Sequence, residues 1–560
     1  MQKRRHPLLT LSCAIFLLVI LLFCAKPVWE KVEPTDTAPK GTKGLAYHAL
    51  SDGTYSVSVG SATNAKKIVI PEVYNGKAVT AIADRGFGGA SKLEKITIPD
   101  SVIKIGDFAF NNCSELVTVK LPPHLVCIGA HAFAGCKALS ELTVPDSVLN
   151  LGDACFFGCT KLERVTLGDG VAQIGTDVFF GCTKLASVAL PENLTEIGER
   201  AFFGCKALAE LTVPDSVTEI GEAAFSGCAK LERLALGDGV TVIGAYAFSG
   251  CSSLTVSTLP NSLVEIRDFA FSGCAGFELT EYEGISYLGS HDNPYHVAVG
   301  FSSSATETSV PVFHPDTKII LYRAFQKNAS ITSLSFPNGL LSIGDSAFEE
   351  CRTFENCLVI PDTTKVIGDY AFRLICSRAL HLGNSVERIG VEAFSGAMGL
   401  TAIEIPDSVT ELGECAFYSC KSAQTLTIGN GLRELGRGVF KSCSKIREVR
   451  IPDTVKTIAS EVFSNCKSLH WVVVPTSVEQ IDQGAFSGMN FRSVLIFYEG
   501  DRAQWWASHG MIDETDVFYY SQAEPTENQS LYWIYVNGEP TRWRDLVPSN
   551  PPVWEDGSKG

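Results

Sequence analysis

Residues 215–236, DSVTEIGEAAFSGCAKLERLAL, contain the pattern from which most of the chain is built. The phenylalanine of this stretch, Phe225, recurs every 23 residues, at Phe87, Phe110, Phe133, Phe156, Phe179, Phe202, Phe225, Phe248 and Phe271. After one interruption, with one interval of 24 and one of 22, the series resumes at Phe325, Phe348, Phe372, Phe394, Phe417, Phe440, Phe463 and Phe486. These 17 copies predict a solenoid, because a fixed period in this range is typical of stacked structural repeats.

Each copy divides into four pieces. Leu231–Leu236 alternates apolar and polar residues, which predicts a short strand, and a Pro-Asp or Gly-Asp-Gly turn follows it. Val217–Ile220 predicts a second extended piece, and Glu222–Cys228 spaces its apolar residues like one turn of helix. The predicted fold is therefore a mainly β repeat solenoid with one short helical turn per 23-residue repeat and β-rich caps at both ends.

The recurring pattern L-x-x-I-x-I-P-x-x-V-x-x-I-G-x-x-A-F-x-x-C resembles the BspA-type leucine-rich repeat, which is found mainly in surface proteins of bacteria and some protists. The resemblance covers about residues 80 to 497. It implies a leucine-rich-repeat solenoid that is displayed on the cell surface or shed from it and is associated with adhesion to host proteins or other cells. It implies no catalytic residue, and no binding residue can be transferred from the family, because the repeated positions are structural.

The composition favours a folded, acidic protein. Charged residues make up 19% of the chain and hydrophobic residues 45%, so the sequence can bury an apolar core. The net charge of −16 makes nucleic acid an unsuitable partner, because phosphate binding needs a basic face.

The N-terminus has the pattern of an export signal. Lys3, Arg4 and Arg5 precede the uncharged and mostly apolar run 8–25. Residues 1–25 are therefore predicted to be a signal peptide or an N-terminal membrane anchor, and residues 26–44 a linker. In either case we expect an extracellular or cell-surface protein whose contact with the membrane is limited to this N-terminal segment.

The 17 recurring phenylalanines are called anchor phenylalanines below. The chain has 19 cysteines, and twelve of them follow an anchor phenylalanine by three residues. In stacked coils these side chains would all point the same way, which is poor geometry for disulfides between neighbours. We therefore expect buried free thiols rather than a disulfide framework or a metal site. The twelve are Cys113, Cys136, Cys159, Cys182, Cys205, Cys228, Cys251, Cys274, Cys351, Cys420, Cys443 and Cys466.

Interruptions of the period define the remaining segments. An insertion separates Phe271 from Phe325, and within it the sequence predicts a strand, a turn at Asp292–Pro294 and a returning strand, which together form a hairpin leaning on the solenoid. The alternatives are a ligand-contacting loop and a metal site formed by His291, Asp292 and His296. The predicted organisation is an N-terminal cap at 45–80, a first block of repeats at 81–277, a hairpin insertion at 278–308, a second block at 309–497, an aromatic C-terminal cap at 498–545 and a disordered tail at 546–560.

Aromatic residues are concentrated after the last repeat. Five of the seven tryptophans lie there, at Trp505, Trp506, Trp533, Trp543 and Trp554. One interpretation is a cap that covers the core of the last coil, and the other is an aromatic surface that stacks on sugars.

The candidate partner-binding residues lie at outward positions of the predicted strands, where side chains have no role in the core. At the C-terminal end, the neighbouring residues Trp471 and Val473 would contact either a partner or the folded-back tail. The candidates are Lys95, Thr97, Lys120, Glu141, Arg164, Glu210, Arg233, Glu404, Arg450, Trp471 and Val473.

The sequence contains no recognisable catalytic motif. We find no G-x-S-x-G, no H-E-x-x-H and no phosphate-binding loop, and the ten histidines are scattered. The leading hypothesis is a non-enzymatic, monomeric protein without cofactor or metal, which mediates adhesion or protein binding through its exposed strand face. The alternatives are a structural envelope spacer without a specific ligand, and carbohydrate binding through the aromatic C-terminal segment.

Overall fold

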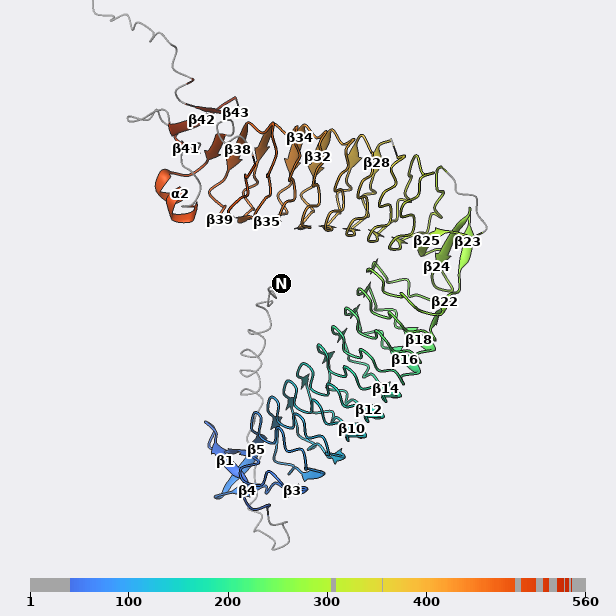
Figure 1. Ribbon diagram of the computed structural model, residues 1–560, viewed down its shortest axis with the longest axis vertical. Helices are drawn as coiled ribbons and strands as arrows, with labels where there is room; N and C mark the ends of the chain where they lie inside the picture. The colour runs from blue at the N-terminus through green and yellow to red at the C-terminus, as the bar shows by residue number, and fades with distance from the viewer. Residues whose placement is uncertain are drawn as a thin grey trace, which may run out of the picture.

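The chain forms a β-solenoid whose coils stack into two arms that meet at a bend (Figure 1). The computed structural model describes residues 41–303, 309–354, 356–488, 495–509, 517–522, 531–537, 539–542 and 545. The predicted signal or anchor at 1–25, nearly all of the linker and the predicted disordered tail lie outside the described residues. Within the described ranges, no helix combines the length and the apolar character that a membrane span requires.

The first predicted strand of each coil stacks on its counterpart in the next coil and forms what we call the outer row. Neighbouring strands are parallel, as in the pairing of Leu211 with Leu234. Figure 1 shows this row on the convex side of the bend. Its strands are β3 (Lys67–Val69), β6 (Lys95–Thr97), β8 (Thr118–Val119), β10 (Glu141–Thr143), β12 (Arg164–Thr166), β14 (Ser187–Ala189), β16 (Glu210–Val213), β18 (Arg233–Leu236), β20 (Thr255–Val256), β22 (Gly276–Phe277), β28 (Leu358–Val359), β30 (Leu380–His381), β32 (Ala402–Ile405), β34 (Thr425–Ile428), β36 (Glu448–Arg450), β38 (Trp471–Val474) and β40 (Leu495–Tyr498).

The second extended piece of each coil forms a parallel inner row on the concave side (Figure 1). These strands are mostly two residues long, because a glycine ends most of them. The coils pack closely at this glycine and leave little space for a larger residue. A Cβ on Gly221, for example, would come within 2.6 Å of the Gly198 backbone. The row consists of β5 (Lys77–Ile82), β7 (Lys104–Ile105), β9 (Cys127–Ile128), β11 (Asn150–Leu151), β13 (Gln173–Ile174), β15 (Glu196–Ile197), β17 (Glu219–Ile220), β19 (Val242–Ile243), β21 (Glu265–Ile266), β26 (Ile319–Ile320), β27 (Ser342–Ile343), β29 (Val366–Ile367), β31 (Arg388–Ile389), β33 (Glu411–Leu412), β35 (Glu434–Leu435), β37 (Thr457–Ile458) and β39 (Gln480–Ile481).

The third side of the coil is a run of turns, and the predicted helical turn is not confirmed. The amide of Phe225 donates to Ala247 O of the next coil at 2.7 Å, whereas the amide of Cys228 donates locally to Phe225 O at 3.2 Å. Ala223 and Gly227 have φ values of 52° and 75°, in the left-handed region that a right-handed helix excludes. The alternation of local and inter-coil bonds satisfies the backbone while binding neighbouring coils together.

The anchor phenylalanines stack through the core as the 23-residue period predicts. The ring centroids of Phe202 and Phe225 are 5.1 Å apart, and those of Phe225 and Phe248 are 5.4 Å apart, with interplanar angles of 5° in both pairs. All three rings are fully buried. This continuous column of aromatic contact supplies the apolar wall that a single coil cannot make for itself.

The predicted buried free thiols are confirmed for most of the column. All 17 cysteines among the described residues are free, and eleven of the twelve that follow an anchor phenylalanine are buried, Cys274 being partly exposed. Each of the twelve thiols donates to the carbonyl of the anchor phenylalanine of the preceding coil, at 3.1–3.4 Å. A small residue with a weak donor therefore fits this position.

The N-terminal end of the stack is closed by antiparallel strands. β1 (Ala46–Ala49) pairs with β2 (Tyr55–Ser58), and β4 (Val73–Tyr74) pairs with β5 across a turn at Asn75-Gly76, where both residues have positive φ. These strands cover the side of the first coil that has no preceding repeat.

The insertion contributes three strands, β23 (Thr280–Tyr282), β24 (Ile285–Leu288) and β25 (Val297–Phe301). β24 and β25 are antiparallel, as the sequence predicts, but the hairpin does not merely lean on the solenoid: β25 pairs in parallel with β26 and starts the inner row of the second arm. The insertion lies at the bend in Figure 1. The hydrophobic core also divides there into two clusters that both include residues of the insertion. One runs from the first arm through Leu288 and Val297 to Leu321, and the other begins at Ile285.

The C-terminal end extends the outer row beyond the last repeat. β41 (Val517–Tyr520) pairs in parallel with β40, β42 (Tyr532–Val536) pairs in parallel with β41, and β43 (Glu539–Arg542) closes the sheet antiparallel to β42. Helix α2 (Arg502–His509) follows β40, and its Trp505 is 1% exposed. Among the described residues of these elements, the aromatic side chains of Trp505, Phe518, Tyr519 and Trp533 are buried.

Candidate binding face

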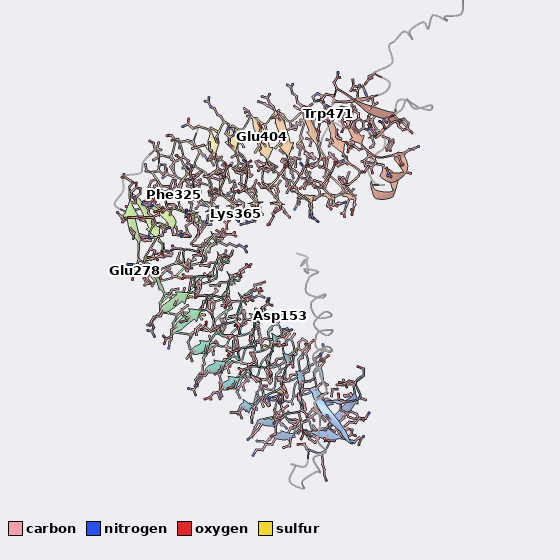
Figure 2. All side chains as sticks on the ribbon, turned by 180° about the vertical axis from the view of Figure 1, so that it is seen from behind. Asp153, Glu278, Phe325, Lys365, Glu404 and Trp471 are labelled. Atoms are coloured by element: carbon pink, nitrogen blue, oxygen red, sulfur yellow. The ribbon has the colours of Figure 1, made fainter. Side chains whose placement is uncertain are left out.

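The predicted candidate residues lie on the outward side of the outer row. Figure 2 shows Glu404 and Trp471 on the convex side, and Asp153 and Lys365 on the concave side. Strand alternation produces this arrangement, since Leu142 of β10 is buried while its neighbours Glu141 and Thr143 are exposed. The exposed candidates are Lys95, Thr97, Lys120, Glu141, Arg164, Glu210, Arg233, Glu404 and Arg450.

Several of these charges face each other across neighbouring coils. Arg164 lies opposite Glu141, with Nη2 2.6 Å from Oε1. Arg233 lies opposite Glu210 at 2.9 Å, and this hydrogen bond raises the pKa of the arginine. Because these pairs are exposed, they contribute little to stability and remain available for contacts with a partner.

Two lysines of the first arm have no such counterpart. Lys95 and Lys120 form no ion pair in the part of the chain that the structure describes. Together with Arg164, they give this stretch of the outer row more positive charge than the chain as a whole, which carries −16.

A shallow groove lies where the outer row is interrupted. Hydrogen-bonded pairing joins β6 to β8 and β10 to β12, but β8 and β10 belong to different sheets. The groove at this interruption has a volume of about 530 Å³ and is lined by Thr118, Lys120, Pro123, Glu141, Thr143 and Pro145, among others. Two candidates from the sequence, Lys120 and Glu141, therefore share one concave site.

Of the two alternatives for Val473, contact with the C-terminal segment is the one that the structure shows. Its side chain is 3% exposed and packs in a cluster with Phe497, Phe518 and Trp533. The reason is that β40, β41 and β42 extend the sheet of the outer row, and their side chains Phe497, Phe518 and Trp533 pack with Val473. Val473 therefore belongs to the C-terminal core. This side chain is therefore not accessible to a partner.

Two further candidates are engaged by the same cap. The Arg450 guanidinium lies 5.2 Å from the ring centroid of Trp471 and 5.5 Å from that of Tyr535, and its Nη2 is 3.2 Å from Glu539. Trp471 is consequently only partly exposed. The two alternatives for this end of the face were contact with a partner and contact with the folded-back C-terminal segment. Contact with the C-terminal cap accounts for the observed packing.

The structure describes the side chains of two of the five tryptophans on which the carbohydrate interpretation rests, and both are internal. Trp533 is 0% exposed and donates through Nε1 to the carbonyl oxygen of Tyr498 at 2.9 Å. Trp505 packs edge-on against Tyr498 and is 1% exposed. Trp543, Trp554 and the side chain of Trp506 lie outside the described residues.

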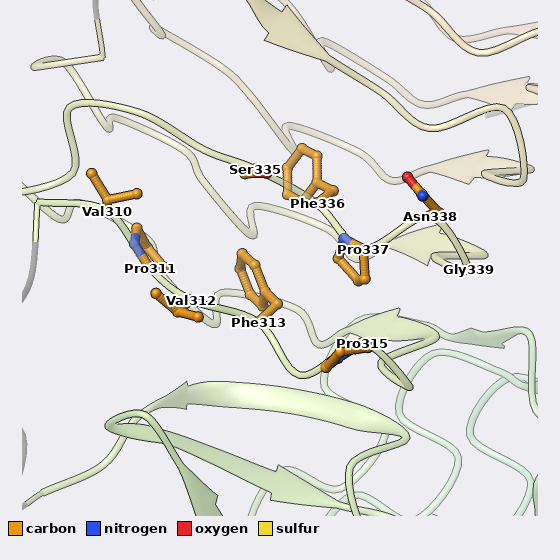
Figure 3. Close-up of a pocket in the computed structure, with 10 residues that line it drawn as sticks. All are labelled: Val310, Pro311, Val312, Phe313, Pro315, Ser335, Phe336, Pro337, Asn338 and Gly339. Carbon is orange, nitrogen blue, oxygen red and sulfur yellow. The ribbon is translucent and has the colours of Figure 1, made fainter.

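A second groove lies at the bend, and we did not predict it from the sequence. It has a volume of about 440 Å³ and is lined by apolar residues of two successive coils, including Val312, Phe313, Phe336 and Pro337 (Figure 3). Val312 is 50% exposed. Its only signal in the sequence is the apolar run 310–313 directly after the insertion.

A surface column of aromatic rings on the turn side was also missed. Phe157, Phe180 and Phe203 stack at 4.8 and 4.7 Å with interplanar angles of 7° and 5°. Phe157 is 39% exposed. Their 23-residue spacing is visible in the sequence. Each of them directly follows an anchor phenylalanine with the same spacing, so the period was assigned to the buried column alone.

The part of the chain that the structure describes contains no group of three or more histidine, cysteine or acidic residues placed to hold a metal ion. His296, beside the turn of the insertion, is 1% exposed and its Nε2 lies 3.0 Å from Leu263 O. Burial lowers the pKa of this histidine. Its hydrogen bond joins the insertion to the last coil of the first arm.

Comparison with protein families gives one match. The model of the BspA type leucine rich repeat region matches residues 80–206, 172–291, 301–401 and 365–492. Merged, these ranges are 80–291 and 301–492, which cover 404 of the 560 residues. No curated protein matches the chain significantly.

Several solved structures are similar in sequence along much of the solenoid. A leucine-rich repeat protein from Bacteroides ovatus is 22% identical and covers 85% of this chain and 98% of its own, with a TM-score of 0.29. A leucine rich cell surface protein from Faecalibacterium prausnitzii is 21% identical and covers 86% of this chain and 100% of its own, with a TM-score of 0.28. A leucine-rich repeat protein from T. pallidum is 27% identical over 38% of this chain and 89% of its own, with a TM-score of 0.30.

Proposed function

Because the chain belongs to the BspA type leucine rich repeat family, we propose that it is a non-enzymatic adhesion or protein-binding scaffold of the bacterial surface. The partner is a protein or another surface ligand, and it is bound through the outward side of the outer row in the first arm. Export would use the N-terminal segment 1–25, whose charge and apolar pattern are those of a signal or anchor.

The observation that carries this proposal is the alternation along each outer strand between inward residues that build the core and outward residues that are exposed. Val165 of β12 is 4% exposed and builds the core, whereas its neighbours Arg164 and Thr166 are exposed. Repeats need only the inward residues to stack, so the outward residues vary without cost to the fold. The groove that contains Lys120 and Glu141 adds concavity to this otherwise flat surface.

The experiment is capture of partners by the purified, immobilised protein from host matrix proteins and from co-resident cells, followed by a saturation isotherm for each captured protein. We expect a saturable partner whose affinity falls at least tenfold in a variant carrying Lys95→Glu and Lys120→Glu. A matched variant with Lys104→Glu, an exposed lysine of the inner row, should bind like the wild type.

Two outcomes would contradict the proposal. The absence of any saturable partner would favour the envelope spacer. Equal loss of binding in the outer and inner variants would show that charge alone, and not the outer face, determines the interaction.

A further inference from the structure

Side chains of the second arm complete the last inner strand of the first arm. In the regular inner row, Thr241 O accepts the amide of Val264 from the next coil at 2.8 Å. β21 ends its sheet, so the equivalent carbonyl, Val264 O, accepts the hydroxyl of Ser342 at 2.6 Å instead. These two residues are 78 positions apart in the chain. The bend is therefore an interface between the two arms.

An ion pair and a ring contact hold the same interface. Arg388 of β31 places Nη2 2.7 Å from Oε1 of Glu265 in β21, across 123 residues of sequence. Close by, the guanidinium of Arg323 lies 4.4 Å from the ring centroid of Phe269. Glu265 and Arg388 have side-chain exposures of 12% and 22%, so this pair is shielded from solvent.

The interface also brings carboxylates of the two arms together. Asp268 comes from the first arm, and Asp345 and Asp369 come from successive coils of the second arm. Asp345 is 8% exposed, and its Oδ1 accepts the amide of Asp369. Oδ1 of Asp268 is buried and has no hydrogen-bond partner among the described residues. An unpaired buried carboxylate oxygen beside a second carboxylate is a position that favours a proton.

The surrounding cations are largely committed elsewhere. Arg388 is held by Glu265 and lies 3.7 Å from Asp369, and Arg373 is hydrogen-bonded to Glu349. Arg323 acts on Asp268 and opposes its protonation without abolishing the effect of burial.

The pKa values follow from this environment. Burial, reinforced by the charges of Asp268 and Asp369, raises the pKa of Asp345 to about 7, against the opposing effects of the hydrogen bond from the Asp369 amide and of Arg388. Burial likewise raises the pKa of Asp268, with contributions from Asp369 and Glu349. Two further titratable groups lie at the interface. Burial lowers the pKa of His296, so its ring stays neutral down to a pH below the ordinary range. Burial and the charge of Asp268 raise the pKa of Tyr322, so its hydroxyl stays protonated.

We propose that the bend is a proton-dependent joint, in which a proton taken up by Asp268 and Asp345 holds the two arms together and its loss loosens them. The joint would change how the second arm lies relative to the proposed binding face of the first arm, and in this respect it rests on the proposed function.

The direction of the effect follows from linkage. The bent arrangement binds the proton of Asp345 more tightly than an open arrangement, where its carboxyl would regain an ordinary pKa of about 4. The bent arrangement is therefore fully favoured below about pH 4, and it loses stability as the pH rises to about 7. Above that range both carboxylates are charged and repel each other.

Small-angle X-ray scattering of the full chain at constant ionic strength tests the proposal. We expect the radius of gyration to increase between pH 5.5 and pH 8.5 with a midpoint near 7. Asp345→Asn should abolish this increase and keep the arms bent at both pH values, because an amide oxygen still accepts the Asp369 amide but carries no charge. Asp153→Asn is the matched control: Asp153 accepts the amide of Thr176 in the same way, far from the bend, so this variant should behave like the wild type.

Asp268→Asn provides a second test if Asp345→Asn does not fold, and circular dichroism at both pH values reports whether the coils remain intact. Identical scattering of the wild type at pH 5.5 and 8.5 overturns the proposal, and so does a transition that persists in both asparagine variants. The measurement uses no partner, so its result is independent of whether the proposed binding function is correct.

Discussion

The thiol of Cys228 donates a hydrogen bond of 3.4 Å to the carbonyl oxygen of Phe202, the anchor phenylalanine of the preceding coil. The same relationship, 26 residues apart, joins Cys205 to Phe179 and Cys251 to Phe225. The cysteine column is therefore a ladder of weak hydrogen bonds that runs parallel to the ladder of rings.

The buried thiols should resist modification in the native protein. Burial raises the pKa of Cys113 and Cys351 to about 12, so at pH 8 only about one thiol in ten thousand is ionised at each site. Titration with a thiol-specific disulfide reagent should show rapid reaction at the exposed Cys357 and slow reaction in the buried column. The column should react completely only in denaturant, and rapid labelling of many column thiols at pH 8 would contradict the packing.

Truncation of one anchor ring should interrupt the core. Phe225→Ala removes a fully buried ring between two stacked neighbours, so we expect the free energy of unfolding to fall by about 3–5 kcal/mol. Phe157→Ala, at a ring that is 39% exposed, should cost clearly less. Urea unfolding followed by circular dichroism measures both, and equal losses would show that the buried column is not the principal core.

The turn side should be sensitive to the Cβ at left-handed positions. Gly227 has φ 75°, and an added Cβ would meet only ordinary contact with the Gly204 backbone, at 3.7 Å. Gly227→Ala should therefore destabilise the protein through conformation rather than collision, by about 1–2 kcal/mol. Ala223→Gly, at φ 52°, relieves the same strain and should be neutral or slightly stabilising in the same assay. Destabilisation by Ala223→Gly would argue for a helical turn.

The C-terminal cap should depend on Trp533. Trp533→Ala removes a fully buried side chain and its hydrogen bond to Tyr498 O, which should cost about 3–5 kcal/mol within the cap and expose Val473. Limited proteolysis should then cleave the cap before the repeats. Trp471→Ala, at a partly exposed side chain, is the control and should leave the cap resistant. Loss of glycan binding without loss of cap stability would instead support the carbohydrate interpretation.

The repeat itself could be predicted from the sequence because its period determines which residues touch. Phe225 must meet Phe202 and Phe248 once coils of 23 residues stack, and the outward position of Arg233 follows from strand alternation. The turn side was harder, because the spacing of Ala224 and Cys228 fits a helix as well as a run of turns. The glycine that recurs two residues after many anchors, such as Gly227, is the signal that indicates a left-handed position.

The bend and the cap could not be predicted in the same way. No period connects Ser342 with Val264, or Arg388 with Glu265, so their proximity depends on how the insertion turns the chain. The burial of Val473 depends on strands that add to the outer row without repeating its sequence. Contacts made once in a molecule leave no repeated pattern by which to recognise them.

The ion pair between Arg388 and Glu265 has a consequence for how such a chain can change length. Most coils pack on their neighbours through the same contacts. Duplication or loss of a whole repeat within the first arm, or between β31 and β36, would therefore leave both the pair at the bend and the contact of Arg450 with Glu539 intact. Between the insertion and Arg388 the same event would shift the arginine by one coil and separate it from its glutamate. Gain and loss of repeats should therefore be tolerated in those two stretches and selected against in the short interval between them.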